Sequence, residues 1–183
     1  MTAQQIGWRF AMESIFIWIA REAVEEAEGL EGSASASVKM QNRSITAIIM
    51  SAMLTEAFIN VIAEEQLTPT VWKAVERLNV VEKWIVVTKL ITNKEWDKGS
   101  QPFQDFRELI GLRNDLVHYK PKLTTEKFNL DAEFTGVLAR RYFSAACDLI
   151  RGFYEKVGQG VPDSLQPGTR TRGVEIVDID LGQ

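Results

Sequence analysis

Residues 103–121 read FQDFRELIGLRNDLVHYKP and carry more structural information than any other part of the chain. Placed at about 100° per residue, the apolar side chains fall on one broad arc, as they do on a helix that packs against a core. We expect this helix to begin near Pro102, which suits a first-turn position, and to end near Tyr119, because Pro121 cannot continue it. The arc consists of Phe103, Phe106, Leu109, Ile110, Leu112, Leu116, Val117 and Tyr119.

Two charged residues occupy apolar positions. Arg113 lies near the middle of the arc, where an unpaired guanidinium would carry a large desolvation cost. Glu56 lies in the same way at the centre of an apolar stripe on a long helix expected from about Val38 to Gln66. Because each charge needs a partner, we predict an internal ion pair between Arg113 and Glu56 that sets the register of the two helices. The stripe around Glu56 consists of Ile45, Ile48, Ile49, Ala52, Met53, Ile59 and Ala63.

A polar strip of Arg107, Gly111, Asn114 and His118 runs beside the arc. A glycine inside a helix costs about 1 kcal/mol relative to alanine, so Gly111 indicates either a close-approaching helix or ligand, or tolerated sequence drift. His118 is the single histidine of the chain, and in the last helical turn it can exchange protons near neutral pH. One histidine at a helix end is more often a surface or capping residue than a catalyst. A functional role for His118 is therefore indicated only by its position together with Gly111, Arg113 and Asn114.

The rest of the chain also has helical rather than alternating spacing. We expect a first helix from Ile6 through Val24, a helix over residues 72–91 that is broken near Asn79, and a last helix over residues 131–157. The sequence thus predicts an all-α fold, a bundle of four to five helices that run mostly up and down.

Glycine and proline residues recur in the chain after Val157, which is typical of a segment without helical structure. We therefore predict a helical bundle domain over residues 1–157 and an extended C-terminal tail over residues 158–183, in which residues 174–181 alternate weakly, as a docked strand does.

Composition limits the function. The formal net charge of −4 and the sequence pI near 5.2 give no overall attraction to RNA, so any contact needs a local basic patch.

Cys147 is the single cysteine and cannot form an intramolecular disulfide, which favours a cytoplasmic location. Nothing resembles a Cys/His zinc pattern, so we expect no metal and no cofactor. The apolar run from Phe10 to Ala20 is interrupted by Glu13 and followed at once by Arg21 and several glutamates, so we expect neither a signal peptide nor a membrane contact.

The signature residues are Arg113 and Asn114, then three variable residues and His118, at the end of an amphipathic helix and before Lys120-Pro121. This pattern resembles the signature helix of the HEPN family. Residues 51–62, SAMLTEAFINVI, look like the long helix of that family with its acidic residue. The resemblance implies a helical bundle and a homodimer in which the two signature helices approach each other and build one composite site.

Many HEPN proteins are metal-independent endoribonucleases, often toxins or defence factors against phage, so the resemblance implies RNA as substrate and an antitoxin protein as a partner. In such an enzyme His118 acts as general acid or base while the ribose 2′-hydroxyl attacks the adjacent phosphorus. Asn114 orients His118 or a phosphate oxygen, and Arg113 or Arg107 stabilises the charge on the phosphoryl oxygens. Contacts with the substrate are expected from Arg107, Gly111 and Lys120.

Several alternatives stay open. The chain is alternatively a noncatalytic HEPN-like module that binds a nucleotide or a partner protein, or a structural scaffold. A guanidinium fully engaged by Glu56 cannot also bind a phosphate, so either Arg113 contacts both or Arg107 binds the anion. The segments Arg140-Arg141-Tyr142 and Lys120 to Lys122 offer basic contacts, although short charge clusters are usually solvated. The five tryptophans are expected in the core rather than as base-stacking surfaces.

Overall fold

The computed structural model describes residues 6–10, 12–32, 36–118, 134–162 and 174–178. These residues form six helices and one two-stranded antiparallel ribbon, so the body of the protein is all-α as expected, with one helix more than the upper expected number. The elements are β1 (Ile6–Phe10), α1 (Met12–Gly29), α2 (Ser37–Gln66), α3 (Pro69–Val75), α4 (Val80–Thr92), α5 (Gln101–Val117), α7 (Gly136–Val157) and β2 (Val174–Asp178).

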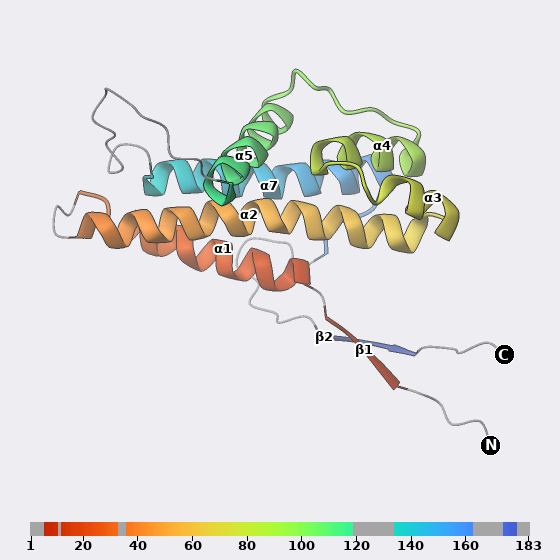
Figure 1. Ribbon diagram of the computed structural model, residues 1–183, viewed down its shortest axis with the longest axis horizontal. Helices are drawn as coiled ribbons and strands as arrows, with labels where there is room; N and C mark the ends of the chain where they lie inside the picture. The colour runs from red at the N-terminus through yellow and green to blue at the C-terminus, as the bar shows by residue number, and fades with distance from the viewer. Residues whose placement is uncertain (1–5, 11, 33–35, 119–133, 163–173, 179–183) are drawn as a thin grey trace.

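Helix α2 is the centre of the bundle and contacts each of the other five described helices. Helix α1 runs antiparallel to it, α7 lies along both, and α5 crosses over α2 and α7 (Figure 1). The up-and-down expectation therefore holds for α1 and α2 but not for α5. Small side chains permit the close contact of α1 with α2, because Ala20, Ala23, Ala27 and Ala47 are all buried.

An aromatic cluster fills the core between α2, α4, α5 and α7. The Trp84 indole is fully buried and stacks on Phe58, with ring centroids 5.6 Å apart, and its Nε1 donates a hydrogen bond to the Thr55 carbonyl oxygen at 3.1 Å. The half-buried Trp96 donates a hydrogen bond to Thr88 Oγ1 at 2.9 Å. Both tryptophans are structural, as the sequence predicted, because each buries a large apolar ring and satisfies its polar N–H.

Most helix boundaries within residues 37–118 follow the sequence signals, but α3 begins at Pro69 rather than at the expected Trp72, because the proline occupies the first turn. Asn79 separates α3 from α4 and caps α4 in a capping box with Glu82, which confirms the predicted break. Helix α5 has Pro102 in its first turn and ends at Val117, with His118 as the C-cap residue. The expected end at Tyr119 lies just outside the described residues.

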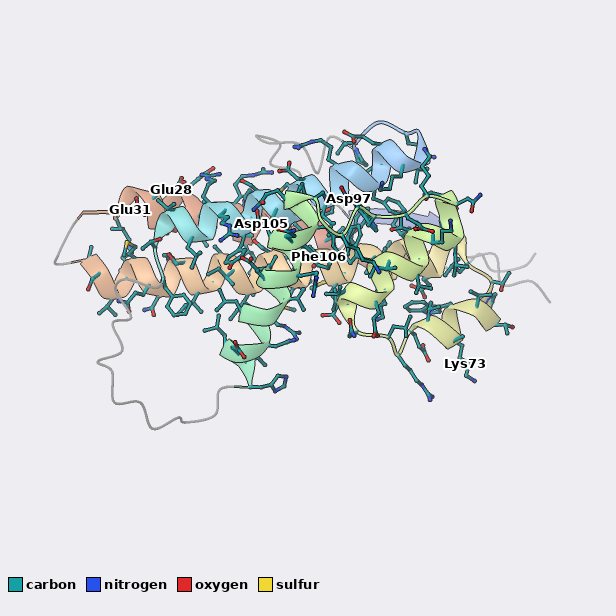
Figure 2. The ribbon with its side chains drawn as sticks, turned by 90° about the horizontal axis from the view of Figure 1, so that it is seen from above. Glu28, Glu31, Lys73, Asp97, Asp105 and Phe106 are labelled. Atoms are coloured by element: carbon teal, nitrogen blue, oxygen red, sulfur yellow. The ribbon has the colours of Figure 1, made fainter. Side chains whose placement is uncertain are left out.

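The acidic end of α1 meets the start of α7. Figure 2 shows Glu28 and Glu31 beside the first turns of α7. Glu31 accepts a hydrogen bond from the Val137 backbone N–H at 3.0 Å, and Arg140 donates two hydrogen bonds to the Glu28 carboxylate, which lower the pKa of Glu28. These acids therefore compensate the positive N-terminal end of α7.

Helix α7 begins at Gly136, not near residue 131 as expected. Thr135 caps the helix, because its hydroxyl accepts a hydrogen bond from the Leu138 N–H at 3.1 Å. Residues 131–133 lie outside the described part of the chain. The helix ends at Val157 as predicted, and Gly158 follows in the left-handed conformation with φ at 81°.

The two ends of the chain pair with each other as a ribbon (Figure 1). The expected helix start at Ile6 is wrong, because residues 6–10 form β1 and the helix begins at Met12. β1 pairs antiparallel with β2, in a register that runs from Ile6 opposite Asp178 to Phe10 opposite Val174. The strand expected in residues 174–181 is thus present over residues 174–178. A short apolar segment is compatible with either period, and pairing with a distant segment decides between them.

Helix α2 is long and apolar enough to cross a membrane by length and composition alone. A core helix of a soluble protein passes the same test, and α2 packs against helices along its length. The cytoplasmic location and the lack of membrane contact remain predictions.

Candidate functional site

The two halves of α5 have different environments. Phe103, Phe106 and Leu109 in the first half are fully buried, whereas Val117 near the end is 53% exposed. In Figure 2 the C-terminal end of α5 extends past α2, away from α7. The predicted apolar arc therefore packs against the core in the first half, but the signature residues lie on the part of the helix that leaves the bundle.

Arg113 and Glu56 face each other where α5 crosses α2. Nη2 of Arg113 lies 3.6 Å from Oε2 of Glu56, so the predicted contact is present. The Arg113 side chain is 28% exposed and the Glu56 side chain is 36% exposed, so the pair is not fully buried. The pair is at the edge of the core because α5 is already leaving the bundle at Arg113, and solvent screens much of its attraction.

Asn114 contacts the second terminal nitrogen of the Arg113 guanidinium. Nη1 of Arg113 donates a hydrogen bond to Oδ1 of Asn114 at 3.0 Å. This contact was not predicted, since adjacent residues on a helix do not usually face each other. The Asn114 amide nitrogen makes no hydrogen bond to any described residue, so it remains able to donate to a ligand.

The predicted polar strip is at the surface. Arg107, Gly111, Asn114 and His118 are all exposed, and a Cβ added to Gly111 would meet no atom within 4 Å. Arg107 has no ion pair with the described residues. The His118 backbone N–H donates to the Asn114 carbonyl oxygen at 2.8 Å, which places His118 one turn after Asn114 at the end of the helix. Lys120, the remaining predicted substrate contact, lies outside the described residues.

A second charged cluster connects α5 to α7. We did not predict it from the sequence. Arg141 donates hydrogen bonds to the buried Asp105, one of them at 3.0 Å, and to Glu108 at 2.8 Å. The hydrogen bond to Asp105 raises the pKa of Arg141. Asp105 falls among the apolar positions of α5 in the projection that singled out Arg113, so the signal was available.

The charges of the basic segment 140–142, which we considered as possible RNA contacts, are compensated by carboxylates. Arg140 is occupied by Glu28 and Arg141 by Asp105 and Glu108. Neither arginine therefore offers an uncompensated charge to a polyanion. Figure 2 shows Asp105 on α5 beside α7, where this contact is made.

Two shallow depressions lie away from the signature residues. One is lined by Pro69, Thr70, Lys73 and Ala74 on α3, and the other lies beside Trp96 and includes Gly152 and Lys156. Among the described residues no group of three or more His, Cys, Asp or Glu side chains gathers in a way that could hold a metal ion. The signature residues thus present an open surface within one chain.

Comparisons of the chain with models of known families, with curated proteins and with solved structures found no match. The HEPN resemblance therefore rests on the residues of the chain itself, on 103–121 and 51–62.

Proposed function

We propose that the chain is a HEPN-type, metal-independent endoribonuclease with a composite site between two copies of α5. The supporting observation is the exposed strip of Arg107, Asn114 and His118 on one side of α5. No side chain of the described residues covers Gly111, which leaves room for a second helix to approach there. A homodimer would turn this open surface into a cleft with two copies of each residue.

The proposed reaction is a transesterification that needs one base and one acid. One His118 imidazole accepts the proton of the ribose 2′-hydroxyl while that oxygen forms a bond to phosphorus. The bond from phosphorus to the 5′-oxygen breaks, and this oxygen takes a proton from the protonated imidazole of the second copy. The products are a 2′,3′-cyclic phosphate end and a 5′-hydroxyl end.

The arginines stabilise the charge that builds up on the phosphoryl oxygens. At 3.6 Å the contact of Arg113 with Glu56 is an ion pair without a hydrogen bond, so the guanidinium keeps donors for a phosphate oxygen. We therefore favour an Arg113 that contacts both Glu56 and the substrate. Arg107 and Lys120 supply further positive charge, which an acidic chain needs locally to bind RNA.

We expect this enzyme in the cytoplasm, as a toxin or a defence factor against phage with an antitoxin protein as a partner. These roles come from the HEPN resemblance alone. The noncatalytic module remains the alternative, and the observation that favours it is that Arg113 already has partners on two sides, Glu56 and Asn114.

The decisive experiment is RNA cleavage by purified wild-type protein and by the His118→Ala variant, in excess EDTA. We expect the variant to lose cleavage while its free energy of unfolding changes by less than about 1 kcal/mol, because His118 is exposed. Arg107→Ala should weaken RNA binding, whereas Lys73→Ala removes an exposed charge on α3 and serves as the control. If wild-type protein cleaves no RNA, or if His118→Ala cleaves as well as wild type, the enzyme proposal fails and the binding module takes its place.

A further inference from the structure

The cluster of Asp105, Glu108 and Arg141 lies in the first half of α5, whereas the signature residues lie in the second half. Asp105 is 8% exposed, and its Oδ1 accepts hydrogen bonds from Nε of Arg141 and from Nε2 of Gln101, each at 3.0 Å. Nη2 of Arg141 also donates to Oε2 of Glu108 at 2.8 Å. Because a buried carboxylate without donors is costly, Asp105 holds α5 against α7 at one fixed place.

Charged contacts tie α5 to the bundle at two points. Asp105 contacts Arg141 of α7, and Arg113, eight residues later, contacts Glu56 of α2. Eight residues correspond to about 12 Å along a helix and to a rotation of about 80° around its axis. Two contacts at different heights and on different faces fix both the direction of α5 and its rotation about its own axis. A single contact would leave the helix free to pivot.

The signature half of α5 has little other support. From Gly111 to Val117 every residue of the helix is half-buried or exposed. His118 follows Asp105 by thirteen residues, which is about 20 Å of helix. A change of about 5° in the direction of α5 would therefore displace His118 by about 2 Å.

We infer that Asp105 and Arg141 are positioning residues, which set the direction of α5 and so place the signature residues for RNA cleavage. This inference rests on the proposed ribonuclease function. The two residues act through the helix and not through contact with the substrate, because Asp105 is buried against α7 and engages Arg141 there. Misplacement of a catalytic group by about 1 Å can lower a rate about a hundredfold, so the direction of α5 matters for the reaction.

The first test compares RNA cleavage by Arg141→Met with cleavage by Arg140→Met. Both variants remove an arginine of α7 that pairs with a carboxylate, and the two side chains are equally exposed at 42%. Arg140 pairs with Glu28 of α1 and not with α5, so its loss should leave cleavage unchanged. Arg141→Met should lower kcat about tenfold or more and change KM by less than about twofold, because RNA would still bind but would meet a misplaced His118.

Since Arg141→Met leaves the Asp105 carboxylate without its guanidinium and can disturb folding, the double variant Asp105→Asn/Arg141→Met is measured as well. It removes both charges and so leaves no buried ion without a partner. It should show the same fall in kcat, because the contact that orients α5 is missing in both proteins.

A distance measurement makes the second test independent of cleavage. Nitroxide labels are attached at Val38→Cys on α2 and at Val117→Cys near the end of α5, two exposed positions, in protein that carries Cys147→Ala. Electron–electron double resonance is recorded on labelled protein diluted with unlabelled protein, so that each distance belongs to one chain. The distance should shift or broaden by about 2 Å or more in the double variant, and it should stay as in wild type in Arg140→Met.

The outcomes separate this inference from the proposed function. If wild-type protein cleaves no RNA, the ribonuclease proposal fails, and the label distance alone decides whether the cluster sets the direction of α5. If wild-type protein cleaves RNA, an unchanged kcat or an unchanged label distance in the double variant would overturn the positioning role. An equal loss of kcat in Arg140→Met would also overturn it, because the effect would then follow general stability. A raised KM with unchanged kcat would instead place Arg141 in RNA binding and end the inference.

Discussion

Removal of the ion pair between Glu56 and Arg113 should cost little stability. From sequence alone, a buried pair would be worth about 3 to 5 kcal/mol when one partner is removed. The structure lowers that value. At 3.6 Å the Coulomb attraction is about 1.2 kcal/mol in bulk water and about 4.6 kcal/mol at an effective dielectric constant of 20. With 28% and 36% of the side chains exposed, screening and side-chain entropy leave a coupling of about 0.5 to 1 kcal/mol.

A double-mutant cycle with Glu56→Gln, Arg113→Gln and the double variant measures this coupling by urea unfolding. The matched control is the pair of Glu26 and Arg43, 2.8 Å apart and similarly exposed, for which the same cycle should return a value within about 0.5 kcal/mol of the first. A coupling above about 2 kcal/mol for Glu56 and Arg113 would refute the reasoning, because it requires a desolvated pair. If that large value appeared only at high protein concentration, a second copy would be covering the pair.

Three further predictions follow from particular residues. Gly111→Ala should raise the free energy of unfolding of the monomer by about 0.5 to 1 kcal/mol, since the added Cβ meets open space, yet it should weaken the homodimer in sedimentation experiments. Gly136→Ala should instead destabilise the protein by about 1 to 3 kcal/mol in urea, because its Cβ would lie 2.8 Å from the backbone nitrogen of Glu28. Burial raises the pKa of the Cys147 thiol from 9.0 to about 11. The unfolded chain therefore loses this proton first, and the wild type should lose stability relative to Cys147→Ala as the pH rises above 9, while native Cys147 resists alkylation at pH 8. An unchanged pH dependence in Cys147→Ala, a stabilising Gly136→Ala or a tighter dimer in Gly111→Ala would each contradict the corresponding argument.

Local sequence determined most of the helical elements. The apolar spacing of residues 38–66 and 103–117 predicts α2 and α5, and Asn79 and Pro102 mark helix starts by their own chemistry. The pairing of Arg113 with Glu56 also followed from the sequence, because two opposite charges on apolar helix faces each need a partner. These features depend on residues within one helix, or on a single pair of helices.

Only the tertiary structure decided how deeply each residue is buried and what lies beside it. Residues 6–10 form a strand because a segment about 170 residues away pairs with them, and no local pattern specifies that partner. The exposure of Arg113 and His118 depends on the angle at which α5 leaves α2, which side-chain packing sets. Lys83 reads as an ordinary surface lysine in the sequence. It is buried because α2 and α3 place Asn60 and Trp72 around it, and such a three-helix environment depends on long-range packing.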